Sequence, residues 1–90
     1  MNPAERRFVP TVDAIRETSA WTKSEWLCRP DLVAADKLLM VRATMDPFHS
    51  HPFHQHPHRE EIIYIIAGRA EQWVGSEYRI LGAGDTAHIP

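Results

Sequence analysis

Residues 54–68 read His-Gln-His-Pro-His-Arg-Glu-Glu-Ile-Ile-Tyr-Ile-Ile-Ala-Gly, so that a histidine-rich segment runs directly into an apolar one. The apolar part, residues 62–66, is β-branched and aromatic throughout, which is the pattern of a strand buried on both faces. Gly68 then interrupts this pattern. The stretch therefore predicts a buried β-strand that follows a cluster of imidazole groups.

His54 and His56 are separated by one residue, which matters because side chains of a strand return to the same face every two residues. Both imidazoles can therefore project into one cavity. The residues that follow can turn the chain, so that the strand opening at Glu61 brings a carboxylate back opposite them. Glu61 would share a face with Ile63 and Ile65, where a charge without a partner is costly and a bound cation removes that cost. Two imidazoles and one carboxylate suit a divalent first-row metal, so His54, His56 and Glu61 are the predicted ligands.

The neighbouring titratable residues have simpler interpretations. Five of the six histidines lie at residues 49–58, and such a loop can also be merely solvated or take up metals loosely. Glu60 would lie on the opposite face from Glu61, so we assign it a role beside the site or on the surface. His58 falls at the expected turn and is predicted to be exposed. His49 and His51 precede the pattern and are interpreted as loop residues.

The same stretch resembles the first motif of the cupin superfamily, in which His-x-His is followed after four residues by Glu and after six more by Gly. The surrounding residues are similar to that motif in small single-domain cupins. Downstream, Leu-Gly-Ala-Gly-Asp at residues 81–85 and His-Ile-Pro at residues 88–90 resemble the opening of the second cupin motif. The resemblance implies an all-β fold, a cupin-type jelly-roll β-barrel.

The resemblance also implies a division of the chain. Residues 38–90 would form the cupin core, with the first motif and the start of the second, and residues 1–37 an N-terminal arm with the first strands. In the family the second motif continues with a glycine and a histidine that supplies a fourth ligand, whereas this sequence ends at Pro90. We therefore expect the C-terminal strands to be missing from this chain. His88 occupies a different motif position, and the sequence does not fix its face.

Short strands and tight turns are expected on both sides of the motif. Gly75-Ser76 suits a type II′ turn between two strands, and the start of the chain, at residues 12–17, allows either a helical turn or an extended arm. The other expected elements are strands at residues 22–25, 38–45, 69–74, 77–81 and 86–90, and turns at residues 28–31 and 82–85.

The composition and net charge of the chain limit the partners and the compartment that can be expected. The chain has 90 residues and a formal net charge of −2, which gives no electrostatic reason to expect nucleic acid or an anionic membrane as partner. The longest apolar run, residues 62–67, is too short to cross a bilayer. Cys28 is the only cysteine, which excludes an intrachain disulfide and favours a reducing compartment. The charged start does not resemble a secretory signal, so we predict a cytoplasmic protein.

Three functional hypotheses follow. The first is a metal-dependent cupin enzyme, dioxygenase-like or isomerase-like, that uses Fe, Mn, Ni or Zn on a small-molecule ligand, with Tyr64 or Trp73 near the pocket; the two aromatics can equally be core or interface residues. The second is a non-catalytic ligand-binding or metal-binding module. The third is a strand-exchanged assembly module, because an incomplete barrel leaves a sheet edge that tends to pair with another chain. We predict a homodimer, because such an edge tends to pair with a second copy, and the resemblance implies the same.

Overall fold

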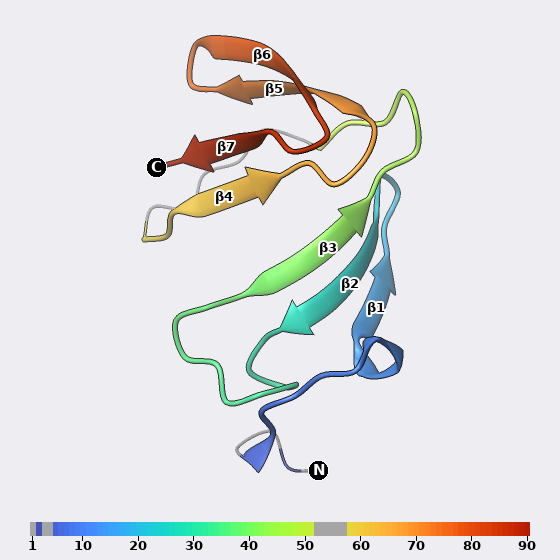
Figure 1. The fold of residues 1–90 in the computed structure, drawn as a ribbon, viewed down its shortest axis with the longest axis vertical. Helices are drawn as coiled ribbons and strands as arrows, with labels where there is room; N and C mark the ends of the chain where they lie inside the picture. Colours follow the sequence, from blue (N-terminus) through green and yellow to red (C-terminus); the bar gives the residue numbers. More distant parts are fainter. Residues whose placement is uncertain (1, 3–4, 52–57) are drawn as a thin grey trace. The chain divides into compact units, whose positions relative to one another are not determined.

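The computed structural model describes residues 2, 5–51 and 58–90, and these form β-strands joined by turns, with no α-helix among them (Figure 1). The predicted all-β fold class is confirmed. The chain divides into two compact units, residues 1–52 and residues 53–90, and each is described by itself. The predicted division into residues 1–37 and 38–90 rests on the family resemblance and stays a prediction.

The first unit is a three-stranded antiparallel sheet in the order β1-β2-β3 (Figure 1). The short 3-10 turn η2 (Thr11–Asp13) leads into β1 (Ile15–Thr18), so the start of the chain contains both conformations that the sequence allowed. The other strands are β2 (Lys23–Cys28) and β3 (Met40–Thr44). Strand β2 is longer than the predicted rim strand, and β3 lies within the predicted residues 38–45.

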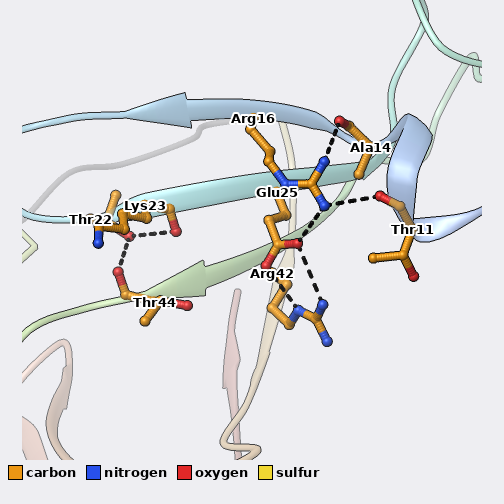
Figure 2. A network of polar contacts seen from close by, with 8 residues as sticks. All are labelled: Thr11, Ala14, Arg16, Thr22, Lys23, Glu25, Arg42 and Thr44. Atoms are coloured by element: carbon orange, nitrogen blue, oxygen red, sulfur yellow. Dashed lines mark hydrogen bonds and ion pairs between the residues drawn. The ribbon is translucent and has the colours of Figure 1, made fainter.

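A row of charged side chains crosses this sheet. Glu25 on β2 lies directly opposite Arg16 on β1 and Arg42 on β3. Its carboxylate is 3.4 Å from Nη2 of Arg16 and 3.3 Å from Nε of Arg42. Figure 2 shows Glu25 between the two guanidinium groups. Arg16 also donates to the carbonyl groups of Ala14 and Thr11, at 3.3 and 3.0 Å. The register thus alternates opposite charges across three strands, which is the favourable cross-strand arrangement.

A turn follows β2, as predicted. The backbone N–H of Leu32 donates to the carbonyl of Arg29 at 2.9 Å, and Leu32 is among the most buried residues, with 6% of its surface exposed. The Arg29 guanidinium forms ion pairs with Asp31 and with Glu17 on β1. Its hydrogen bonds hold the pKa of the Asp31 carboxyl below the usual range. Arg29 therefore links the turn to β1 through these two ion pairs.

The second unit contains two antiparallel pairs (Figure 1). Strand β4 (Glu61–Tyr64) pairs with β7 (Thr86–Ile89), and β5 (Arg69–Val74) pairs with β6 (Glu77–Gly82). In the sequence, the β5–β6 hairpin therefore lies between β4 and β7, which pair directly with each other.

Two tight turns fix the registers of this unit. Val74 lies opposite Glu77, which leaves Gly75-Ser76 as the connection. Gly75 has φ +59°, and Ser76 is not among the described residues with positive φ, so the turn has the predicted type II′ signature.

The predicted turn at residues 82–85 is also present. Its third residue, Gly84, has φ +90°, and the N–H of Asp85 donates to the carbonyl of Gly82 at 3.0 Å. The Asp85 carboxylate accepts the Gly82 N–H at 2.8 Å. Ile65 exchanges backbone hydrogen bonds with Gly84 and Asp85, at 2.8 and 3.0 Å. These bonds continue the β4–β7 ladder into the turn.

The prediction that residues 62–66 are buried on both faces is wrong. Exposure alternates along β4, and Ile62 and Tyr64 are 66% and 60% exposed, whereas Ile63 and Ile65 are half-buried. The physical reason is that no layer of described residues packs against the face of β4 that carries Ile62 and Tyr64, so only the opposite face is partly covered.

The core is small in both units. Three apolar residues of the described chain are less than a tenth exposed, and no described side chain is exposed by less than 2%. These residues are Ala14, Leu32 and Leu81. This is little burial for a chain of 90 residues, because even a shorter folded domain buries more than half of the surface that its unfolded chain exposes.

Candidate metal centre and adjoining groove

Of the three predicted metal ligands, the structure describes Glu61. His54 and His56 lie outside the described residues. Within the described ranges, no group of three or more His, Cys, Asp or Glu side chains is placed to hold a metal ion. The assembled ligand set therefore stays a prediction, and the structure bears on it through the surroundings of Glu61.

Glu61 is the first residue of β4, and its Cα partner on β7 is Ile89. Directly paired residues share a face of an antiparallel sheet, as do residues two apart on one strand. Glu61 therefore shares its face with Ile63, Ala87 and Ile89, all of them apolar and half-buried, as Glu61 is itself. The predicted common face of Glu61 and Ile63 is confirmed.

The Glu61 carboxylate has no hydrogen-bond or ion-pair partner among the residues that the structure describes. Glu61 is a half-buried residue, and a negative charge on an apolar face is favoured when a cation lies beside it. The residues at this position therefore fit a metal, since a divalent cation would supply the missing counter-charge.

Glu60 and His88 lie together on the opposite face of the same ladder. His88 is the partner of Ile62, and its Nε2 is 2.7 Å from Oε1 of Glu60. Their side chains are 53% and 76% exposed. The structure thus gives His88 the face that the sequence left undetermined, away from Glu61, and it gives Glu60 a surface position as predicted.

The remaining described histidines, at residues 49, 51 and 58, are all exposed. The His51 ring stacks on Trp21, with 4.1 Å between ring centroids and 14° between ring planes. His49 lines a small pocket of about 90 Å³ beside the β1–β2 turn. His58 is exposed, as predicted. The Trp21–His51 contact was not predicted, because the two residues are far apart in sequence and carry no local signal for it.

The second unit contains a groove of about 240 Å³ between the β5–β6 hairpin and β7. Its lining residues are Gln72 and Val74 on β5, Glu77, Arg79 and Leu81 on β6, and Thr86, Ala87 and His88 on β7. Ala87 lies diagonally across the ladder from Glu61, a separation of about 7–8 Å in antiparallel sheets. The groove therefore extends close to the predicted metal ligand.

The two aromatic residues considered for the pocket do not line this groove. Tyr64 is exposed, and Trp73 is 47% exposed and pairs with Tyr78 across the hairpin, with ring centroids 5.0 Å apart. Desolvation raises the pKa of the Tyr78 phenol, and a hydrogen bond to Glu71 raises it further. Trp73 and Tyr78 thus share the face of the hairpin opposite to the groove, and Tyr64 is an exposed residue of β4.

In the described parts of the chain, no helix is long and apolar enough to cross a membrane. No curated protein and no solved structure matches the chain significantly. A family model described as "Cupin domain" matches residues 41–90, which is more than half of the chain and includes the whole histidine–glutamate motif. The nested pairing of β4 with β7 around the β5–β6 hairpin lies within this match. The chain therefore belongs to the cupin family.

Proposed function

We propose that this cupin domain holds a divalent transition metal, Fe, Mn, Ni or Zn, with His54, His56 and Glu61, and binds a small molecule beside it. The observation that carries the proposal is the position of Glu61, a half-buried residue whose side chain lies on an apolar face without a partner among the described residues. The family match supports it, because residues 41–90 include all three proposed ligands.

Each proposed ligand has a distinct task. The metal, when bound, would supply Lewis-acid chemistry by polarising an oxygen of the small molecule. Glu61 would contribute a negative charge that partly neutralises the cation, and the two imidazoles would add neutral nitrogen ligands. Ile63 and Ala87 border Glu61 on its face of the sheet and would limit the access of water. A reaction at this site would be dioxygenase-like or isomerase-like, in a cytoplasmic protein.

A second candidate role is assembly, including a homodimer formed by strand exchange or strand addition. It is favoured by the edge of β4 that faces away from β7, which pairs with no other strand in the described ranges. Ile62 and Tyr64 on the same strand expose apolar surface that a second copy could cover. Light scattering over a range of chain concentrations would test it: the proposal expects a dimer, and a monomer at all concentrations would contradict it.

Metal content tests the proposed function. The protein is purified without chelators, and its metal is compared in the unmodified chain, His54→Ala, Glu61→Ala and the control His58→Ala. We expect stoichiometric metal in the unmodified chain and in the control, and its loss in the two ligand variants. Equal metal content in all four proteins would refute the site and would assign the metal to loose uptake by the histidine-rich loop.

A further inference from the structure

The groove of the second unit follows an open strand edge. Thr86, Ala87 and His88 are consecutive residues of β7, and all three line it. Successive side chains of a strand point to opposite faces, so three consecutive residues can line one groove only along the edge of the strand. An open strand edge presents both backbone N–H and backbone C=O groups. Its N–H groups can donate hydrogen bonds to a ligand in the groove.

Arg79 supplies a positive charge to the facing wall. It lies directly opposite Gln72 in the β5–β6 register, and both line the groove. Its guanidinium donates a hydrogen bond to the backbone carbonyl of Tyr78, at 2.9 Å. No carboxylate of the described residues forms an ion pair with it, in contrast to Arg16 and Arg42 in the first unit. The guanidinium keeps donors available for a ligand.

The rest of the lining limits what that ligand can be. Val74 and Leu81 give the same wall an apolar surface, and Leu81 is one of the most buried residues of the chain. Glu77, two residues before Arg79 on the same face, adds one negative charge. A second anionic group on the ligand would be repelled by it. The groove thus combines one cation, amide and backbone donors, and an apolar wall, with a charge that disfavours dianions.

We propose that this groove binds small monocarboxylic acids with an apolar body, with the carboxylate on Arg79 and Gln72 and the body against Val74 and Leu81. Arginine suits this role because its planar guanidinium can donate two parallel hydrogen bonds to a carboxylate. The inference deepens the proposed function and rests on it in one respect: through Ala87 the groove approaches Glu61, so the bound acid would be the small molecule beside the metal.

Benzoate is the probe, and its neutral amide, benzamide, is the matched ligand control. Binding is measured by calorimetry and by NMR shift changes, on EDTA-treated protein and on protein reloaded with metal. We expect Arg79→Gln to weaken benzoate binding by about tenfold or more, since hydrogen bonds to charged groups contribute about 1.5–3 kcal/mol. Arg69→Gln, on the outer face of the same hairpin, should leave benzoate binding unchanged. Glu77→Gln should strengthen it, and benzamide should bind weakly to all variants.

The two preparations separate this inference from the proposed function. Arg79-dependent benzoate binding in the EDTA-treated protein supports the groove even if no stoichiometric metal is found. The inference is overturned if benzoate does not bind, if Arg79→Gln and Arg69→Gln have equal effects, or if benzamide binds as tightly as benzoate. Metal loss in Glu61→Ala without any effect of Arg79→Gln would keep the metal site and reject the carboxylate groove.

Discussion

Nε2 of His88 lies 2.7 Å from Oε1 of Glu60, on the face of the β4–β7 ladder opposite to Glu61. Two adjacent glutamates therefore have different environments: the Glu60 side chain is exposed and hydrogen-bonded to an imidazole, and Glu61 is a half-buried residue on an apolar face. Because the two glutamates lie on opposite faces, we propose Glu61 as the metal ligand. His88 lies on the face of Glu60 and therefore away from Glu61.

The position of His88 predicts that it is not a metal ligand. His88→Ala should lower metal affinity by less than the roughly tenfold loss that follows removal of an outer-shell partner. The measurement is a competition titration with a chelator of known affinity. Loss of stoichiometric metal in this variant would show that the imidazole reaches the ion and that the assigned face is wrong.

The type II′ turn predicts a stability difference between two glycines. Gly75 has φ +59°, so Gly75→Ala should destabilise the folded chain by about 1–2 kcal/mol, the cost of a side chain in the left-handed region. Gly82 has no positive φ, and a Cβ there would lie 3.9 Å from the nearest atom, Oδ2 of Asp85. Gly82→Ala should therefore change stability by less than about 0.5 kcal/mol. Urea denaturation measures both, and equal losses would contradict the turn assignment.

The charge row of the first unit is expected to contribute modestly. Its distances of 3.3–3.4 Å exceed those of strong charge-assisted hydrogen bonds, and the arginine side chains are about half exposed. A double-mutant cycle of Glu25→Gln and Arg42→Gln should give a coupling near the lower end of about 0.2–1 kcal/mol. The coupling should vanish at high salt, since screening weakens exposed pairs. A coupling that persists at high salt would contradict the description of these ion pairs as exposed.

The Arg29–Asp31 pair predicts a pH dependence with a defined sign. Because Arg29 lowers the pKa of Asp31 in the folded chain, the pair stabilises the fold above the usual value of 3.8. That stabilisation is lost as the pH falls through the lowered value. Asp31→Asn should therefore be less stable than the unmodified chain near neutral pH, and the difference should shrink at about pH 3.

Urea midpoints at both pH values measure this effect. Asp36→Asn is the matched control, because Asp36 forms no ion pair with the described residues and the substitution removes the same charge. A difference between Asp31→Asn and the unmodified chain that does not depend on pH would contradict the assigned role of the pair.

Much of the second unit could be predicted from the sequence because its signals are local. The alternation in β5 and β6 and the Gly75-Ser76 connection each depend on a few neighbouring residues, and the observed strands match them. Glu61 shares the predicted face with Ile63 because side-chain direction repeats every two residues along a strand. Local periodicity was therefore sufficient wherever a single strand or turn decided the outcome.

The remaining features depend on which strands meet, and local pattern does not carry that information. The run at residues 62–66 is equally compatible with one covered face or two. In the structure one face is exposed, because no layer of described residues packs against it. The Glu60–His88 contact requires the register of two strands that are separated by the whole hairpin. The stacking of His51 on Trp21 likewise depends on how a loop returns to the β1–β2 turn.

The most direct test of the metal site compares Glu61→Gln with Glu60→Gln. Both substitutions remove one carboxylate, at adjacent positions where β4 begins, and the two side chains lie on opposite faces of the β4–β7 ladder. The measurement is the affinity for Ni²⁺ and Zn²⁺ of the EDTA-treated chain, determined by competition with a chelator. We predict that Glu61→Gln loses at least about tenfold in affinity and that Glu60→Gln binds as the unmodified chain does. Equal affinities of the two variants, or a loss confined to Glu60→Gln, would contradict a metal site built on Glu61.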